Sequence, residues 1–425
     1  MKVALYTLGC KLNQAETEAL SSHLSRAGFQ LVSPDDGADV CIANTCTVTH
    51  IADRKSRHWL RLARRRNPRA LIIATGCYAQ RSSHDLAPLA DLVLDNEEKQ
   101  GLPAIIQTLA LEERGLGEGG AEQYQMLGAA TRVRSLIKIQ DGCQSPCTYC
   151  IVPEVRPREY SLPASQIIDD VKQKVSLGYR EVILTGTKVG AYRHGNIDLR
   201  NLVRRILGGT GIERLRLSSL QPSEISCQFL ALWQDHRLCR HFHLALQSGS
   251  ETVLRTMRRS YSLEQYQTTA DSIKQMMPDA AITTDIMVGF PAESDEEFEQ
   301  SYSFCQQAGF ANIHVFPFSR RPGTTAADMP DQVKDKAKQE RNRRMLELSQ
   351  ISRRRFCEQF LGQTMSVLWE KETGPGSGIY SGLTANYIRV FSHSEKPLSN
   401  EITSVRLLEF HNHSIWGKVL GENPG

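Results

Sequence analysis

Three closely spaced cysteines, Cys143, Cys147 and Cys150, constrain this chain of 425 residues more than any other feature. They follow a mostly apolar run, Leu136–Ile139, of the kind that forms a buried strand. A structural zinc site commonly takes four ligands from two cysteine pairs, yet no further Cys or His follows within forty residues. Three thiolates on a cubane of four irons would leave one iron open to a small chelating molecule. The trio therefore predicts such a cluster, and a zinc knuckle or three buried thiols remain the alternatives.

Length and composition predict a cytoplasmic protein of two or three domains. The mean hydropathy of −0.36 and the lack of a long apolar run exclude a membrane span. The N-terminus, Met1–Leu5, has the pattern of a strand and lacks that of a secretory signal. Without an export signal, the eleven cysteines are expected to be metal ligands in a reducing compartment rather than disulfides.

The N-terminal third alternates continuous apolar strands with amphipathic helices, which predicts a parallel α/β sheet. Residues 101–134 lose this pattern, and the glycine-rich segment Leu116–Gly120 predicts a domain boundary. The predicted strands are Lys2–Leu8, Asp39–Ala43 and Ala70–Ala74, and the predicted helices are Lys11–Ala27 and Asp53–Arg66.

A second set of cysteines, Cys10, Cys46 and Cys77, stands at the C-terminal ends of these three strands. That edge of an open α/β sheet is where ligands bind, so folding would bring the three thiols together. Gly9 and Gly76 precede two of them and would let the backbone approach another group closely. We predict a second three-cysteine iron–sulfur cluster, and a buried thiol is the alternative for each residue.

Six further strands alternate with helical segments after the predicted boundary, which indicates a curved, incomplete version of the eight-stranded (βα) barrel. A basic helical stretch spans residues 330–360, and five short strands follow it, which predicts a small antiparallel β-barrel of a class that often binds oligonucleotides. The first six strands are Ser135–Gln140, Glu181–Thr185, Arg214–Ser219, His241–Gln247, Ala281–Val288 and Asn312–Phe318, and the last five are Thr364–Trp369, Ile379–Leu383, Tyr387–Phe391, Ile402–Phe410 and Ile415–Val419.

Basic residues gather on the predicted helix Asp53–Arg66. A charge run of this kind is usually a solvated helix face, but its excess of positive charge favours contact with a phosphate backbone. A second basic stretch near residues 334–355 supports that interpretation. The candidate RNA-binding residues are Arg54, Arg57, Arg61, Arg64 and Arg65.

The spacing Cys143-x-x-x-Cys147-x-Tyr149-Cys150 and the layout of the whole chain resemble the radical S-adenosylmethionine (SAM) methylthiotransferases. Four phrases carry the resemblance beyond the trio: Tyr6-Thr-Leu-Gly-Cys10-Lys, Gly76-Cys77-Tyr-Ala-Gln80, Lys138-Ile-Gln-Asp-Gly-Cys143 and Arg321-Pro-Gly-Thr324. The resemblance implies an N-terminal α/β domain over residues 1–115, a partial (βα)6 radical SAM barrel over 130–360 and an RNA-binding barrel similar to a TRAM domain over 361–425. Two loops depart from the family's wording, at Arg156-Pro157 and at Ala292, without loss of a predicted ligand.

The resemblance implies two [4Fe-4S] clusters, SAM, a sulfur source that is either the second cluster or added sulfide, and a flavodoxin- or ferredoxin-like electron donor, in a monomer. The cluster on Cys143, Cys147 and Cys150 would bind SAM and release a 5′-deoxyadenosyl radical, while the cluster on Cys10, Cys46 and Cys77 would handle the sulfur. It implies no catalytic residue beyond the cluster ligands. By family position the SAM contacts would be Tyr149, Gly186, Thr187, Ser219, Gln247, Gly289 and Phe290.

The sequence of these motifs is most similar to that of the family branch that methylthiolates C2 of N6-threonylcarbamoyladenosine next to the tRNA anticodon. The alternative substrates are isopentenyladenosine in tRNA and an aspartate of a ribosomal protein. A non-catalytic iron–sulfur RNA-binding protein is the alternative from another functional class, although such a protein has no need of open irons.

Overall fold

The computed structural model describes residues 1–114 and 133–421, which fall into two compact units. The first unit consists of residues 1–114, 141–144 and 150–159, and the second consists of residues 133–140, 145–149 and 160–421. The predicted boundary at Leu116–Gly120 lies outside the described residues. None of the helices in the described part of the chain combines the length and hydropathy needed to span a membrane.

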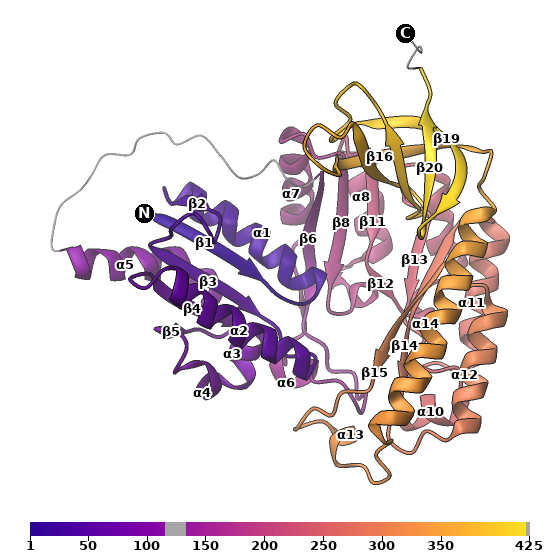
Figure 1. The fold of residues 1–425 in the computed structure, drawn as a ribbon, viewed down its shortest axis with the longest axis horizontal. Helices are drawn as coiled ribbons and strands as arrows, with labels where there is room; N and C mark the ends of the chain where they lie inside the picture. The colour runs from indigo at the N-terminus through magenta and orange to yellow at the C-terminus, as the bar shows by residue number, and fades with distance from the viewer. Residues whose placement is uncertain (115–132, 422–425) are drawn as a thin grey trace. The chain divides into compact units, whose positions relative to one another are not determined.

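A five-stranded, fully parallel sheet forms the centre of the first unit, with strand order β2-β1-β3-β4-β5 (Figure 1). The three predicted strands and two predicted helices are confirmed. The elements are β1 (Lys2–Thr7), α1 (Lys11–Arg26), β2 (Gln30–Val32), β3 (Val40–Thr45), α2 (His50–Arg66), β4 (Leu71–Gly76), α3 (Cys77–Arg81), α4 (Ser83–Leu86), β5 (Leu92–Val93), a short 3-10 helix (Glu98–Gly101), α5 (Leu102–Arg114) and α6 (Val152–Val155).

Two sequence expectations for this unit are wrong or incomplete. Residues 101–114 were expected to lack a pattern, but α5 forms there because Leu102 and Ile106 bury one face in the core beside the sheet. The edge strands β2 and β5 were missed, since three and two residues are too few to show a period. Helix α2 begins at His50 because the Thr49 side chain accepts a hydrogen bond from the Ala52 amide.

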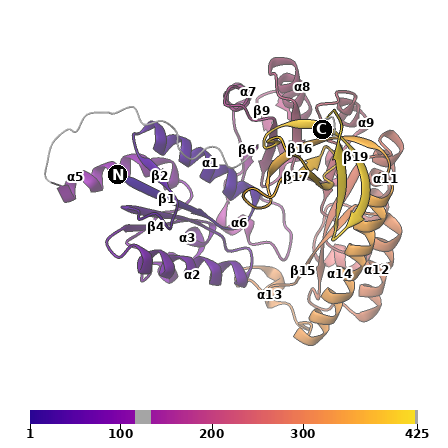
Figure 2. The same ribbon diagram turned by 45° about the horizontal axis from the view of Figure 1, so that its top comes forward.

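The six predicted strands of the second unit are present, in two four-stranded sheets rather than one (Figures 1 and 2). Parallel strands β6, β8 and β11 form the first sheet with β7 at its edge, and β12 to β15 form the second. The predicted strand Arg214–Ser219 is interrupted at Ser218, and this interruption divides the sheets.

The helices that cover these sheets alternate with the strands as predicted. The elements of this part are β6 (Arg134–Asp141), β7 (Tyr160–Ser161), α7 (Ala164–Ser176), β8 (Glu181–Gly186), β9 (Arg193–His194), β10 (Ile197–Asp198), α8 (Leu199–Gly209), β11 (Arg214–Leu217), β12 (Ser219–Leu220), α9 (Cys227–Leu230), β13 (His241–Leu244), α10 (Glu251–Thr256), α11 (Leu263–Met276), β14 (Ala281–Val288), α12 (Asp295–Ala308), β15 (Asn312–Pro317), α13 (Thr325–Asp328) and α14 (Asp335–Glu358).

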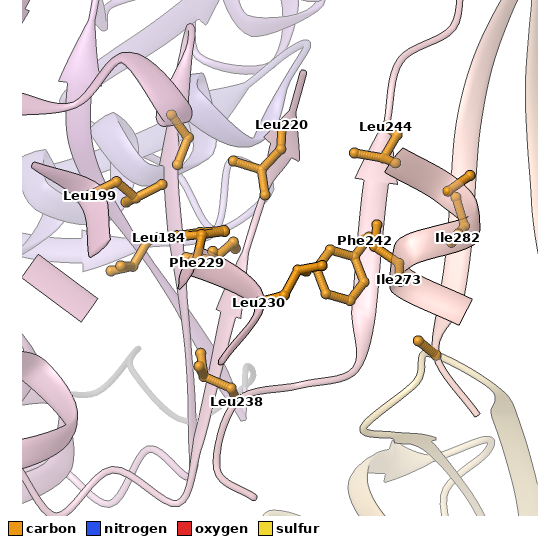
Figure 3. Packing of buried hydrophobic residues seen from close by; sticks show 14 of the residues in the cluster. Leu184, Leu199, Leu220, Phe229, Leu230, Leu238, Phe242, Leu244, Ile273 and Ile282 are labelled. Atoms are coloured by element: carbon orange, nitrogen blue, oxygen red, sulfur yellow. The ribbon is translucent and has the colours of Figure 1, made fainter. Parts of the chain in front are cut away.

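A large apolar core fills the space between these strands and their helices (Figure 3). Leu184, Phe242 and Ile282 from three strands are almost fully buried there, with Ile273 from α11. Each such side chain stabilises the fold by about 1.5–3 kcal/mol. Because strand residues alternate between faces, the residues next to these in sequence point to the opposite, inner face of the sheets, where polar side chains gather.

The C-terminal strands close into a barrel with order β16-β17-β18-β20-β19. The prediction of an antiparallel barrel is wrong at one pair, because β18 and β20 are parallel. This pairing places β20 between β19, which precedes it in sequence, and the non-consecutive β18, and local sequence patterns do not show such an insertion. The strands are β16 (Thr364–Glu372), β17 (Ile379–Thr384), β18 (Arg389–His393), β19 (Ile402–His411) and β20 (Ser414–Val419).

This barrel packs on the central strands within the same compact unit. The guanidinium of Arg214 on β11 donates to the Leu383 carbonyl at 2.9 Å, and that of Arg216 donates to the Ala385 carbonyl at 3.0 Å. Arg216 also pairs with Glu181 on β8 at 2.8 Å, and both side chains of this ion pair have no exposed surface. The terminal barrel therefore supplies carbonyl acceptors for Arg214 and Arg216. Charged groups buried without such partners would destabilise the fold.

Candidate metal centres

The three cysteines of the N-terminal set leave three adjacent strands at the same edge of the first sheet. Cys10 follows β1 and is the N-cap of α1, Cys46 follows β3, and Cys77 begins α3 directly after β4. Thr45 pairs with Gly76 in the register of β3 and β4, so Cys46 and Cys77 continue from neighbouring positions. The structure therefore brings these predicted ligands to one rim.

Two glycines allow the close approach that the sequence predicted. Gly9 has φ of 98°, and a Cβ there would lie 2.7 Å from the Cys46 sulfur. Gly76 has φ of 96°, and its Cβ would lie 2.5 Å from the Thr45 carbonyl oxygen. Such distances are far inside van der Waals contact, and both φ values are unfavourable for residues with a side chain. The rim is thus a cradle that a Cβ would fill, as expected where backbone encloses a bulky group.

The Gly9→Ala substitution is expected to displace the Cys46 sulfur and so to prevent binding of the N-terminal cluster. Because that cluster is one of two, the variant should lose about half of the bound iron. Gly28→Ala is the matched control, since Gly28 also has positive φ, 85°, but has no atom within 4 Å of an added Cβ. It should cost only about 1–2 kcal/mol of backbone strain and keep the iron. Iron analysis after anaerobic reconstitution measures both, and a full iron content in Gly9→Ala would contradict the assignment of this cradle.

Burial, with a smaller contribution from the Cys77 and Cys10 sulfurs, raises the pKa of Cys46 to about 12. The Cys46 thiol is therefore protonated at neutral pH until a cation displaces its proton. Within the described residues, no three Cys, His, Asp or Glu side chains converge on a single metal-ion position. A cubane cluster does not require that convergence, because each thiolate binds a different iron, and the donor set at the rim fits such a cluster.

A buried group of four charges lies beside this rim. Arg156 pairs with Glu16 and with Asp141 at 2.8 and 2.7 Å, and Lys99 pairs with Glu16 at 2.7 Å. The side chains of all four are at most 9% exposed. Burial alone lowers the pKa of Arg156, but the Cys77 sulfur and then Glu16 raise it well above its usual value. Sequence reasoning missed this group, because its members come from four distant segments.

The second cysteine set is divided between the two units. Cys143 and Cys150 belong to the first unit, where the Cys143 amide donates to the Arg156 carbonyl at 3.4 Å. Ile151 and Val155, which follow Cys150, form a small apolar cluster with Cys77. The loop that carries two of the predicted ligands is therefore folded together with a ligand of the N-terminal set.

Cys147 belongs to the second unit, where Arg259 is its charged neighbour. The Arg259 guanidinium donates to the Cys147 sulfur at 3.3 Å and to the Tyr149 hydroxyl at 3.4 Å, and it stacks on the Tyr261 ring at 4.9 Å. The Thr148 amide donates to the Met257 carbonyl at 3.1 Å. These contacts fix the loop and place a cation beside a thiol, which suits a thiolate ligand. No sequence signal marked Arg259, which lies more than 100 residues after Cys147.

Four predicted SAM contacts lie at strand ends or in the loops that follow strands of the second unit. Gln247 has φ of 71°, unusual for a residue with a side chain, and its amide donates to the Asp285 carbonyl at 2.8 Å. Gly289 also has positive φ, 72°, and donates to the Glu293 carboxylate at 2.6 Å. Gly186 ends β8, where a Cβ would lie 2.7 Å from the Gln140 carbonyl oxygen, and Thr187 follows it. These four stay predictions as SAM contacts.

The other predicted contacts differ in accessibility. Tyr149 is half-buried and bonded to Arg259, whereas Phe290 is fully buried and packs edge-to-face on Phe318 at 5.8 Å. The Phe290 side chain therefore belongs to the core, and only its backbone can face a ligand. Ser219 is exposed and bonds the ring of His243 at 2.8 Å.

Ser219 begins a polar row on the inner face of the second sheet. His243 Nδ1 lies 2.8 Å from the Ser219 hydroxyl, and His243 Nε2 lies 3.1 Å from an Asp285 carboxylate oxygen. The ring of His314 on β15 lies 5.8 Å from that of His243. The neighbouring residues Leu244 and Ile286 face the apolar core, so the row lies on the opposite face. The alternation in β13 and β14 could have indicated it.

The predicted RNA-binding arginines of α2 divide into two groups. Arg57 donates to the Tyr78 hydroxyl, and Arg64 pairs with Asp91 at 2.5 Å, so both have structural partners. Arg54, Arg61 and Arg65 are exposed, and no carboxylate pairs with them among the described residues. Arg61, Arg64 and Arg65 line an open pocket of about 420 Å³ with residues 87–91.

Two family models match the chain. Residues 2–94 match an uncharacterized protein family, UPF0004, and residues 137–305 match the radical SAM superfamily. Among solved structures, the radical SAM methyltransferase TsrM from Kitasatospora setae shares the fold, with a TM-score of 0.57 and 13% identity over 77% of this chain and 75% of that chain.

Curated relatives match almost the whole chain. Threonylcarbamoyladenosine tRNA methylthiotransferase MtaB from Bacillus subtilis is 35% identical over 96% of this chain and 94% of its own length. MtaB from Aquifex aeolicus is 37% identical over 92% of this chain and 96% of its own. The tRNA-2-methylthio-N(6)-dimethylallyladenosine synthase from Syntrophotalea carbinolica is 31% identical over 97% and 98%.

Proposed function

The chain belongs to the radical SAM methylthiotransferase family, and we propose that it inserts sulfur at C2 of N6-threonylcarbamoyladenosine in tRNA and methylates that sulfur. The observation that carries the choice of substrate is the identity of 37% and 35% to two relatives named for that nucleoside, against 33% and 31% to two named for dimethylallyladenosine. The protein is an enzyme that uses two [4Fe-4S] clusters and SAM.

Six cysteines would hold the clusters. Cys10, Cys46 and Cys77 would hold one at the rim of the first sheet, and Cys143, Cys147 and Cys150 would hold the other. When bound, SAM would supply the radical and the methyl group, and the clusters would pass on the electron from a small iron–sulfur or flavin protein. The sulfur would come from the N-terminal cluster or from added sulfide bound there. The chain's own side chains orient these groups: Arg259 beside Cys147, and Arg156 beside Cys77.

The polar row supports the polar substrate. A threonylcarbamoyl group carries a carboxylate and a hydroxyl, whereas a dimethylallyl group is wholly apolar. Ser219, His243 and His314 present hydrogen-bonding groups on the inner face of the sheet, and such groups suit a substrate that carries a carboxylate and a hydroxyl better than one that is wholly apolar.

Offering the reduced enzyme both substrates tests the choice. We expect methylthiolated product from tRNA that bears threonylcarbamoyladenosine and little from otherwise identical tRNA that bears isopentenyladenosine. Preference for the second tRNA would contradict the proposed substrate, and modification of a ribosomal protein alone would contradict tRNA as the acceptor.

The exposed arginines of α2 support contact with the tRNA phosphates. Replacing Arg54, Arg61 and Arg65 together by Gln should weaken tRNA binding and reduce the slope of log K against log salt by about three, because each phosphate contact contributes about one. Cleavage of SAM without tRNA should not change. Binding at several salt concentrations measures the slope.

A matched control removes three arginines that already have carboxylate partners on α12 or α14. It should leave the slope close to that of the parent, and an equal loss in both variants would show that only net charge matters. The control changes to Gln are at Arg343, Arg344 and Arg354.

A further inference from the structure

Arg156 donates a hydrogen bond to the Cys77 sulfur, with Nε 3.4 Å from Sγ. Among the described residues, it is the one cationic side chain seen to do so. Its guanidinium is 5% exposed. The remaining nitrogens are held from other sides: Nη1 by Glu16 and Asp141, and Nη2 by Glu16 and the Asn13 amide oxygen. Because these partners fix the plane of the guanidinium, the direction of its Nε–H toward the sulfur is fixed as well.

Asn13 ties the same guanidinium to the cysteine loops. Its amide nitrogen donates to the carbonyl of Leu8 at 2.9 Å and to that of Thr45 at 3.0 Å, just before Cys10 and Cys46. Its amide oxygen accepts from Arg156 at 3.1 Å. A shift of Arg156 would therefore move the backbone that carries the other two thiols, so the contact is part of the rim and not a peripheral ion pair.

The charges beside the rim make this donor significant. Arg156 and Lys99 carry two positive charges, and Glu16 and Asp141 carry two negative charges, so the buried group is neutral by itself. Three thiolate ligands add negative charge next to it. A cluster's reduction potential depends on net charge, on hydrogen bonds to its sulfurs and on solvent exposure, and a fixed donor to a thiolate favours the more negative, reduced state.

We propose that Arg156 is a positioning residue of the N-terminal cluster, and that its hydrogen bond to the Cys77 thiolate raises the reduction potential of that cluster. The inference rests on the proposed function in one respect, the assignment of a [4Fe-4S] cluster to Cys10, Cys46 and Cys77. The Arg156 carbonyl also accepts the Cys143 amide, so one residue orders the rim and the start of the second cysteine loop.

The test uses the full-length chain with Cys143, Cys147 and Cys150 all changed to Ala, so that only the N-terminal cluster remains. In this background the paired change Arg156→Gln with Asp141→Asn removes the donor and keeps the buried group neutral. We expect the midpoint potential, measured by EPR-monitored redox titration, to become more negative. The paired change Arg64→Gln with Asp91→Asn removes a partly exposed ion pair of the same unit, so it also keeps neutrality but leaves Arg156 with all its partners, and its midpoint should stay close to that of the background.

Each result decides between the claims. An unchanged midpoint in the Arg156 pair, with iron retained, would overturn the role of Arg156 while the cluster assignment stands. A background chain that binds no iron would overturn the assignment and the inference together. If the Arg156 pair does not fold, Arg156→Lys decides alone: it keeps the charge and loses the fixed fork, so a smaller negative shift supports the inference and an unchanged midpoint and EPR spectrum overturns it.

Discussion

The Cys147→Ala variant is expected to produce no 5′-deoxyadenosine from SAM, whereas Cys46→Ala is expected to produce it and yet make no methylthiolated nucleoside. Cys147 lies in the loop of the radical SAM motif beside Arg259, so its loss would remove a proposed ligand of the cluster that binds SAM. Cys46 lies at the rim of the other sheet, in a different compact unit. Its loss should therefore spare SAM cleavage and remove only sulfur transfer.

The two products are measured in the same anaerobic reaction, with dithionite as reductant and tRNA that bears threonylcarbamoyladenosine. Cys227→Ala is the control, because Cys227 is exposed and belongs to neither predicted cysteine set. It should keep both products. Methylthiolation at the parent rate by Cys46→Ala would mean that the N-terminal set is structural.

Removing the carboxylate of Glu181 is expected to lower the free energy of unfolding of the second unit by about 3–5 kcal/mol, since it leaves the Arg216 charge buried without its partner. Neither side chain of this pair has exposed surface. Burial raises the pKa of Glu181, but Arg216 together with Arg134 and Arg214 lowers it by more, so the net pKa lies below that of an ordinary glutamate. The stabilisation is present at neutral pH and is lost only as the pH falls through that depressed pKa.

Urea unfolding of Glu181→Gln at neutral pH, followed by tryptophan fluorescence, measures this loss. Glu347→Gln is the matched control, because Glu347 pairs with Arg343 on the surface of α14 with 55% of its side chain exposed. Exposed pairs contribute about 0–1 kcal/mol. Equal urea midpoints for the two variants would show that the buried pair stabilises the second unit no more than the exposed pair does.

Local spacing and strand ends made the placement of the six cysteines in the fold predictable, because each follows a short-range pattern of its own. Positions that depend on contacts across long stretches of chain were not predictable in this way. Arg156 and Arg259 look like ordinary basic residues in sequence, and only the fold brings them to Cys77 and Cys147. The same reason explains the parallel pairing of β18 with β20, which closes the terminal barrel between distant strands.

The α2 arginines show the same division within one helix. The run of positive charge is visible in sequence, but whether each arginine is free depends on neighbours outside the helix. Arg57 bonds to Tyr78, and Arg64 pairs with Asp91. Arg54, Arg61 and Arg65 remain exposed on the helix. Helix α5 was missed for a similar reason: its apolar residues Leu102 and Ile106 pack in a core with residues of distant strands.

Mass spectrometry of nucleosides from tRNA tests the central claim most directly, in cells with the chain, without it, and with its Cys46→Ala form. The account predicts 2-methylthio-N6-threonylcarbamoyladenosine only in cells with the parent chain, and unmodified N6-threonylcarbamoyladenosine in the other two. An unchanged level of the methylthio nucleoside without the chain, or a loss of 2-methylthio-isopentenyladenosine instead, would contradict it.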